Sequence, residues 1–231
     1  MTLATLVVMA LCIKLGLWQF RKAEVKESLQ RMLEQSQTLA PVKLPTAIND
    51  IEKWRYRRVK FAGTYEPKFQ ILLDNQVENG VAGFNVLTPV KLENSQQYVL
   101  VNRGWIAGRL DRKLPVVEVP LGRHEVVGDI IIPLAKVFTF DAPQYGGEWQ
   151  LLWQNIDMQR YTKAISADVK PYVVRLDVNS NAGGFSRQWP APGNRASMHL
   201  GYAYQWFGFA FTLFVIYIVL NIKKTKSQES V

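Results

Sequence analysis

The sequence is poor in the residues that hold metals and disulfides. Its 231 residues include a single cysteine, Cys12, and two histidines, His124 and His199. One cysteine excludes an internal disulfide framework, a CxxC redox pair and a thiolate metal cluster. The two histidines, one cysteine and five methionines also form no cluster of the soft ligands that copper prefers. The composition therefore disfavours a structural metal site and copper delivery, and Cys12 is interpreted as a small apolar side chain.

Motifs of the common enzyme classes are missing as well. The chain has no GxSxG or HExxH segment, no P-loop, and no GxGxxG turn between a predicted strand and helix. The acidic residues Asp74, Asp141 and Asp157 are scattered and form no pair at a defined spacing for acid–base catalysis. We therefore predict that the protein is not an enzyme.

Charged residues are nearly absent from two long stretches, one near each end. Residues 2–17 contain only Lys14, and residues 196–222 contain no Asp, Glu, Lys or Arg. At ~1.5 Å of rise per residue, roughly 20 helical residues cross the hydrocarbon core of a bilayer. We therefore predict transmembrane helices at residues 1–20 and 199–222.

The orientation of these spans follows from the basic residues of the tail, residues 223–231. Lys223, Lys224 and Lys226 come directly after the second span, and such residues stay on the cytoplasmic side. Two spans then place both termini in the cytoplasm and residues 21–198 outside it. The net charge of +9 indicates contact with anionic lipid, and a chain anchored at both ends is a poor nucleic-acid binder. No basic residue precedes the first span, which leaves open whether the natural chain starts upstream of Met1.

The region between the spans is long enough for one folded domain. Glu, Lys, Gln, Leu and Met dominate residues 19–37, which predicts a helical stalk. Short segments rich in β-branched and aromatic residues follow, separated by Pro and Gly, and predict strands at residues 56–65, 69–74, 84–92, 98–105, 125–132 and 172–178. Such strands are typical of a compact barrel or sandwich.

The end of this region contains one predicted helix and one predicted loop. The helix covers residues 158–167, with Asp157 as its N-cap. Residues 179–194 are rich in Gly, Asn, Ser and Pro and predict a flexible return to the membrane. The expected fold class is membrane-anchored α+β, in which two transmembrane helices flank a mainly antiparallel β domain with one or two short helices.

Small or polar residues at helical spacing predict how the two spans pack. In the first span they recur on one face and end at Gln19; in the second they form a row of Gly201, Gln205, Gly208 and Thr212. Small residues let helix backbones approach, and side-chain amides bond across the gap. We therefore expect the spans to form a hairpin in which Gln19 lies near Gln205.

His199 begins the second span, where the aromatic residues are densest. On a helix it shares a face with Tyr202, Ala203 and Trp206, and a small residue between aromatic side chains leaves room for a flat ring. Imidazole is an axial ligand of haem iron. The alternative is that His199 and its neighbours belong to the aromatic belt of a membrane interface. The spacing leaves both interpretations open.

Three further features are weaker candidates. Lys14 either extends to the lipid headgroups along its own stem or pairs with an anionic ligand group. His124 has no second histidine or cysteine near it and is a poor metal ligand. The basic run at residues 54–60 predicts a solvated or lipid-facing strand, or a salt-bridge platform for a partner protein.

Several segments, in the same order along the chain, resemble the surfeit locus protein family. They are residues 15–22 (LGLWQFRK), 57–65 (RRVKFAGTY), 83–89 (GFNVLTP), 99–105 (VLVNRGW) and 199–210 (HLGYAYQWFGFA). The resemblance covers nearly the whole chain. Matching positions whose role it implies to be mainly structural are Gly16, Trp18, Gln19, Gly63, Arg103, Gly104 and Trp105.

The resemblance implies a non-catalytic assembly factor for cytochrome c oxidase. The protein would assist insertion of haem a into the large catalytic subunit, with His199 as a reversible ligand of the haem iron. Gln205 and Trp206 are candidate contacts of the haem or of the subunit, and Tyr202 is a candidate contact of the haem. Expected partners are that subunit, the enzymes of haem a synthesis, membrane lipid and a second copy of the chain. The alternative is an adaptor that stabilises oxidase intermediates without binding haem. No mitochondrial presequence is visible, which favours a bacterial plasma membrane.

Overall fold

The computed structural model describes residues 2–109, 113–133, 149–193 and 195–228. Asp141 and the side chains of Lys223, Lys224 and Lys226 lie outside this description. The chain forms two compact units, one made of Met1–Leu33 with Pro190–Val231 and the other of Glu34–Trp189.

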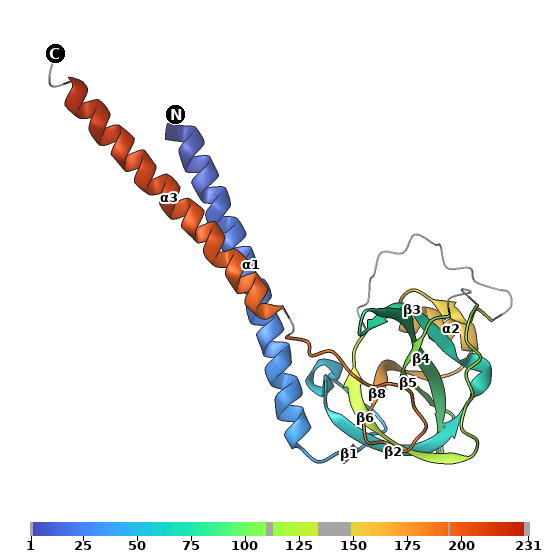
Figure 1. The fold of residues 1–231 in the computed structure, drawn as a ribbon. Helices are drawn as coiled ribbons and strands as arrows, with labels where there is room; N and C mark the ends of the chain where they lie inside the picture. The colour runs from blue at the N-terminus through green and yellow to red at the C-terminus, as the bar shows by residue number, and fades with distance from the viewer. Residues whose placement is uncertain (1, 110–112, 134–148, 194, 229–231) are drawn as a thin grey trace. The chain divides into compact units, whose positions relative to one another are not determined.

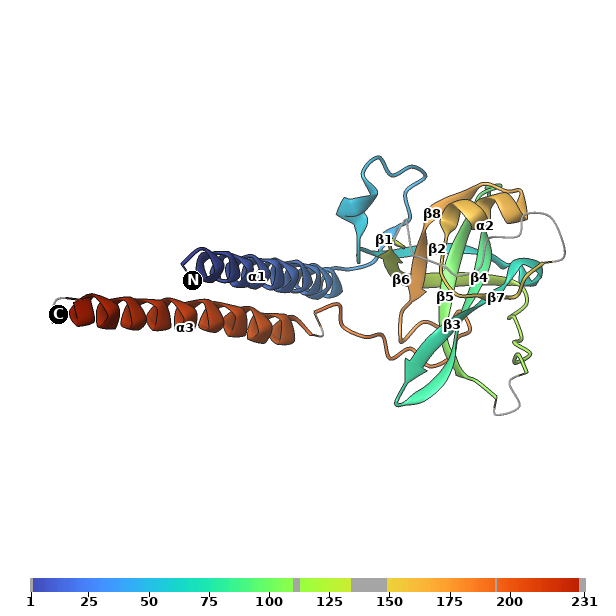
Figure 2. The same ribbon diagram turned by 90° about the horizontal axis from the view of Figure 1, so that it is seen from above.

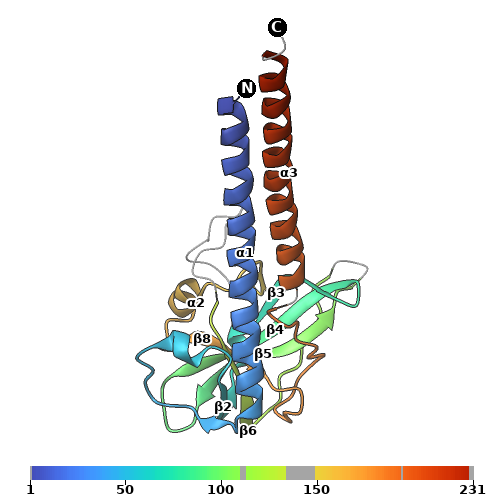
Figure 3. The same ribbon diagram turned by 90° about the vertical axis from the view of Figure 1, so that its left-hand side faces the viewer.

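The first unit is a pair of long helices. Helix α1 spans Thr2–Thr38 and helix α3 spans Ala196–Gln228. They run antiparallel, with the two chain ends at the same end of the pair (Figure 1 and Figure 3). Both are long and apolar enough to cross a membrane. Helix α1 is not interrupted at residue 20, which confirms the helical stalk; the points where the spans of residues 1–20 and 199–222 would leave the membrane stay predictions.

The second unit is built around a closed β-barrel. Five strands form the ring through consecutive pairings, and the β2–β4 pairing closes it; in ring order they are β2 (Arg58–Tyr65), β6 (Arg123–Ile131), β8 (Val169–Leu176), β5 (Tyr98–Ala107) and β4 (Val81–Leu92). Three more strands extend the sheet, namely β3 (Ile71–Glu78), β7 (Leu152–Trp153) and β1 (Val42–Lys43). Most pairings are antiparallel, which confirms the predicted fold class.

Alternating side chains of the strands fill the barrel. Along β2, Val59, Phe61 and Tyr65 are buried at every second position, as expected where one face of a strand lines a core. Gly63, between them, pairs with both β6 and β4. A Cβ atom at Gly63 would lie 2.3 Å from the carbonyl oxygen of Lys91, so only glycine fits where the ring closes.

A second core lies outside the barrel, under helix α2 (Met158–Ile165). Asp157 accepts a hydrogen bond from the backbone of Arg160, which confirms it as the N-cap. Helix α2 lies beside β8 and buries Tyr161 and Ile165 (Figure 2). The hydroxyl of Tyr161 donates to the carbonyl oxygen of Phe69 at 2.8 Å.

The six predicted strands exist, and their ends lie within four residues of those predicted. The two-residue strands β1 and β7 and the short 3-10 helices at Ile51–Trp54 and Pro67–Phe69 were not predicted, because such short segments carry no periodic pattern.

The prediction of a flexible return was wrong for the part of the chain that pairs with β5. The backbone of Ser186 exchanges hydrogen bonds with Trp105, and Phe185 N–H donates to the carbonyl oxygen of Arg103. The side chain of Arg187 donates to the backbone oxygens of Asp177 and Ser180. Composition indicated a loop correctly but gave no sign of these tertiary bonds.

Candidate functional site

His199 is hydrogen-bonded across the helix pair to Gln19. Its Nδ1 lies 2.8 Å from Oε1 of Gln19. An amide oxygen only accepts, so Nδ1–H is the donor of this bond, and in the neutral ring Nε2 then keeps its lone pair. Among the described residues, Nε2 has no hydrogen-bonding partner. The ring is half-buried, one nitrogen is held by α1, and the other remains available as a ligand.

The helices meet along a seam of small residues. On α3 the buried residues are Ala196, Ala203 and Ala210, spaced seven apart. On α1 the most buried are Cys12, Gly16 and Ala23, with partly buried Thr5, Met9 and Gln19 at the intervening three- and four-residue steps. This is the a/d spacing of coiled coils. The predicted packing face of the first span is therefore confirmed.

The predicted packing face of the second span was wrong. Added Cβ atoms at Gly201 and Gly208 would meet nothing within 4 Å among the described residues, and Gln205 is exposed. The partner of Gln19 is His199 rather than Gln205. On α3, alanines and not glycines allow the close approach to α1. With 3.6 residues per turn, an α-helix cannot present both the alanine row and the glycine row to the same neighbouring helix.

The space expected between aromatic residues on the His199 face is closed. Ala203 is 0% exposed in the helix seam, so no flat ring fits over it without parting the helices. Tyr202 is 47% exposed and Gln205 is exposed, while Trp206 is half-buried and packs edge-to-face on Phe209 at 5.8 Å. The structure does not test these three as haem contacts, and they stay predictions.

Basic side chains surround this level of α1. Lys14 is exposed. Nζ of Lys22 lies 5.9 Å from the ring centre of Trp18, which precedes Lys22 by one helical turn. Lys14, Trp18 and Lys22 recur every four residues and share one helix face. Arg21, two residues after Gln19, is exposed too. Positive charge is thus available within two turns of the histidine's partner.

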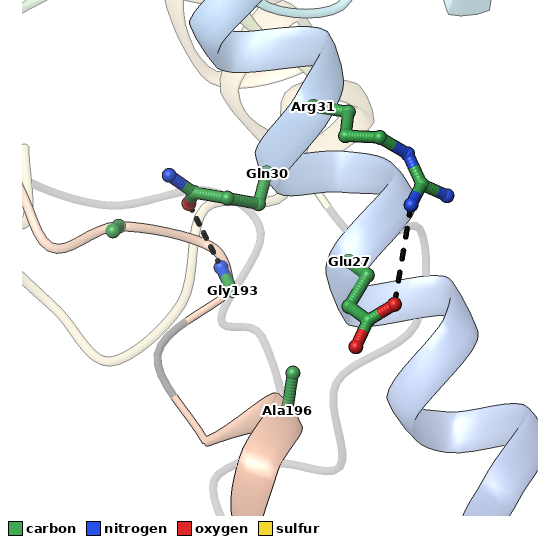
Figure 4. Close-up of a pocket in the computed structure, with 6 residues that line it drawn as sticks. Glu27, Gln30, Arg31, Gly193 and Ala196 are labelled. Carbon is green, nitrogen blue, oxygen red and sulfur yellow. Dashed lines mark hydrogen bonds and ion pairs between the residues drawn. The ribbon is translucent and has the colours of Figure 1, made fainter.

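A pocket of about 440 Å3 opens beside the residues that lead into α3. Figure 4 shows Gln30 of α1 accepting a hydrogen bond from the N–H of Gly193 at 3.2 Å. Arg31 pairs with Glu27 at 3.9 Å on the other side of the pocket. Gln30 therefore fixes the segment before the first turn of α3, the turn that contains His199.

The VNRGW block has a structural role in the barrel. Oδ1 of Asn102 accepts a hydrogen bond from the N–H of Gly104 at the bulge where the β4–β5 register shifts. Arg103 is 2% exposed; its guanidinium lies over the Phe185 ring and donates to the backbone oxygens of Gly183 and Glu118. Burial lowers the pKa of Arg103. The block ties two irregular segments onto β5.

The basic run at residues 54–60 is not a solvated or lipid-facing strand. Arg58 pairs with Asp177 at 2.5 Å, and both side chains are largely buried. Beside them Arg175 pairs with Asp129 at 2.6 Å. Because cross-strand neighbours on one face interact, these charges neutralise one another inside the domain. The spacing of residues along the basic run could not predict its acidic partners, Asp129 on β6 and Asp177 after β8.

His124 lies against the barrel rim. Its Nε2 is 3.1 Å from the carbonyl oxygen of Leu121, and its ring packs on Tyr65 at 5.7 Å. Within the described ranges no three His, Cys, Asp or Glu side chains gather as a metal site.

Comparison with known proteins places both helices and the barrel together in one family. A family model described as the SURF1 family matches residues 6–211, a range that includes Gln19 and His199. A SURF1-like protein of Rickettsia felis is 23% identical over 225 residues, covering 94% of this chain and 95% of the relative. Surfeit locus protein 1 of Takifugu rubripes is 25% identical over 228 residues, covering 92% and 93%.

A yeast relative matches a smaller part. Cytochrome oxidase assembly protein SHY1 of Saccharomyces cerevisiae is 28% identical over 128 residues, which is 53% of this chain and 33% of the yeast protein. The family resemblance inferred from the motifs is confirmed by these matches. Because the family model matches 206 consecutive residues, this chain belongs to the SURF1 family.

Proposed function

We propose that this protein is a non-catalytic assembly factor for cytochrome c oxidase that assists haem a insertion into the large subunit. The name of the yeast relative, a cytochrome oxidase assembly protein, supports the general role. The observation that carries the haem step is the His199–Gln19 hydrogen bond. Histidines that bind metals commonly donate their other N–H to an oxygen acceptor, which fixes the ring and its tautomer.

The chain's own residues divide the work of holding such a cargo. His199 offers Nε2 to iron, since Nδ1 is committed to Gln19. Lys14, Arg21 and Lys22 supply positive charge for the two propionates, the anionic groups of haem. Because Ala203 is sealed in the seam, the helix pair would hold a porphyrin on its outer surface and not between the helices. An open site of this kind suits a carrier that must release what it holds.

The location follows from the same proposal. The two apolar helices anchor the protein in a bacterial plasma membrane, with both termini in the cytoplasm and the barrel domain outside. Gln19 and His199 then lie at the outer boundary of the hydrocarbon, where the large subunit and the enzymes of haem a synthesis are within reach.

The test is the visible absorption spectrum of the full-length protein purified in detergent from cells that make haem a. We expect a haem spectrum in the native protein and its loss in His199→Ala. His124→Ala is the matched control, since that ring lies in the barrel domain and has its own backbone partner. A native protein without colour, or an unchanged spectrum in His199→Ala, would refute the haem step.

A second candidate function is an adaptor that stabilises oxidase intermediates without binding haem. It is favoured by Val116 and Leu121, which are 95% and 89% exposed in one irregular segment of the domain. Exposed apolar side chains mark protein contacts. In this case oxidase assembly would proceed normally in a His199→Ala strain and fail in a Val116→Asp, Leu121→Asp strain. The proposed haem role predicts the opposite for His199→Ala.

A further inference from the structure

We propose that Gln19 is a positioning residue for His199, and that its amide sets both the tautomer and the donor strength of the ring. This inference rests on the proposed function, because it assigns a part in haem binding to a residue that the motif comparison treats as structural. It is carried by the 2.8 Å contact between Oε1 of Gln19 and Nδ1 of His199.

The position of Gln19 is fixed by its neighbours along α1. Three residues earlier, Gly16 lies against the ring of Phe207, so close that a Cβ atom there would be 2.6 Å from the ring. Eleven residues later, Gln30 holds the backbone of Gly193. The Gln19–His199 pair lies between these two contacts. These three contacts together fix the register of the two helices. The position of the Gln19 amide therefore does not depend on one flexible side chain alone.

The amide acts on the tautomer first. A neutral imidazole carries its proton on either nitrogen, and only the Nδ1–H form leaves Nε2 free to bind iron. An oxygen acceptor at Nδ1 selects that form before the ligand arrives. Without the acceptor, the ring loses both its preferred orientation and its preferred tautomer.

The amide also sets the strength of the ligand. A hydrogen bond from Nδ1–H to an acceptor raises the basicity of the ring, and a carboxylate does so more strongly than a neutral amide because its bond is charge-assisted. An amide acceptor therefore orients the ring fully and strengthens its bond to iron only moderately. That combination fits a site that receives a haem and then gives it up.

The variants that separate these effects are Gln19→Leu, which removes the acceptor, and Gln19→Glu, which replaces it with a carboxylate of similar size. Gln37→Leu is the matched control, since that amide lies exposed on α1 and has no part in the proposed site. All three are made in the full-length protein in detergent. The first measurement uses no haem: 15N NMR of histidine-labelled protein reports which ring nitrogen is protonated, with His124→Ala assigning the two signals.

We expect the Nδ1–H form of His199 in the native protein and in Gln37→Leu, and a mixture of both tautomers in Gln19→Leu. The second measurement titrates ferric haem b, the probe, into each variant. Gln19→Leu is expected to weaken binding by about 10- to 100-fold. Gln19→Glu is expected to favour ferric over ferrous haem by about tenfold, which lowers the midpoint potential by about 59 mV.

The outcomes separate this inference from the proposed function. An unchanged tautomer and unchanged haem affinity in Gln19→Leu would refute the role of Gln19 even where His199→Ala abolishes the haem spectrum. Weaker haem binding in Gln19→Leu with an unaltered tautomer, together with an unaltered midpoint potential in Gln19→Glu, would show a merely structural effect and would also refute the role of Gln19. Failure of His199→Ala to change the spectrum refutes the proposed function itself.

Discussion

The ring of Phe207 on α3 lies directly against the backbone of α1 at Gly16. A Cβ atom at that position would fall 2.6 Å from the ring, well inside van der Waals contact. Gly16 is three residues from Gln19, so this contact and the His199 hydrogen bond belong to one stretch of the seam. The close approach of the two helices and the orientation of the imidazole therefore depend on each other.

Gly16→Val is expected to force the helices apart and to destabilise the pair by about 1–3 kcal/mol, the range typical of overpacking. The Gln19–His199 distance should then lengthen, and haem affinity should fall. Gly208→Val is the control, because a Cβ atom added there meets nothing within 4 Å in the described structure. Thermal melting of the helices in detergent, followed by circular dichroism, measures the effect. A rescue by Phe207→Ala in the Gly16→Val background would identify the clash as its cause.

A comparable prediction concerns Gly104 in the barrel. Its φ is +132°, and a Cβ atom would lie 2.6 Å from the carbonyl oxygen of Ser186, which bonds to Trp105. Gly104→Ala should therefore destabilise the domain by about 2–3 kcal/mol, from backbone strain and a blocked strand pairing. Gly80→Ala is the control: its φ is +79°, but nothing lies within 4 Å, so only the strain of about 1 kcal/mol remains. Equal losses in urea unfolding would contradict the proposed role of the close approach.

Much of the fold could be predicted because its signals are local. The apolar helices, the six main strands and the Asp157 cap each depend on residues close together in the sequence. The row on α1 ending at Gln19 was also predicted correctly, since Gly16 and Cys12 are the small residues there. On α3 both alanine and glycine rows satisfy the requirement for small residues, and sequence spacing alone does not choose between them.

The site was predicted only in part, for the same reason. His199 was singled out from its place at the head of a span, but Gln19 was predicted to lie near Gln205 and not near His199. The Gln19–His199 bond joins positions 180 residues apart and depends on the register of two antiparallel helices. Likewise the acids that neutralise Arg58 and Arg175 become neighbours only when β2, β6 and β8 pair with one another. Contacts of this kind leave no periodic trace in the chain.

The burial of Tyr65 predicts how the stability of the domain changes at alkaline pH. Burial raises the pKa of its phenol to about 12 from 10.0, against the opposing effect of Arg103. Between these values the unfolded chain loses the proton first, so the free energy of unfolding falls as pH rises, by up to ~1.4 kcal/mol per pH unit. The contribution is complete below pH 10 and is lost as pH rises through 12.

Tyr65→Phe should therefore make the loss of stability between pH 10 and 12 less steep. At pH 7 the substitution is expected to be neutral or mildly stabilising, because the buried hydroxyl has no hydrogen-bonding partner in the part of the chain that the structure describes. Urea unfolding of the full-length protein in detergent at pH 7, 10.5 and 11.5 measures both effects. Tyr204→Phe, at an exposed position of α3, should leave the slope as it is. A steep slope that persists in Tyr65→Phe would assign the alkaline loss to other groups.

Asp129 and Arg175 form the most buried ion pair of the described structure, with side chains 15% and 12% exposed. Burial raises the pKa of Asp129 even though Arg175 acts to lower it. Asp129→Asn would leave the guanidinium without its counter-charge, at a cost of about 3 kcal/mol in urea unfolding. Replacing both residues, as Asp129→Leu with Arg175→Met, removes the two charges together and should cost less than the single change. The double-mutant cycle also needs Asp129→Leu and Arg175→Met as single variants. Additive losses in this cycle would show that the two charges are uncoupled. A non-additive result would show that the pair serves to neutralise charges that the barrel has already buried.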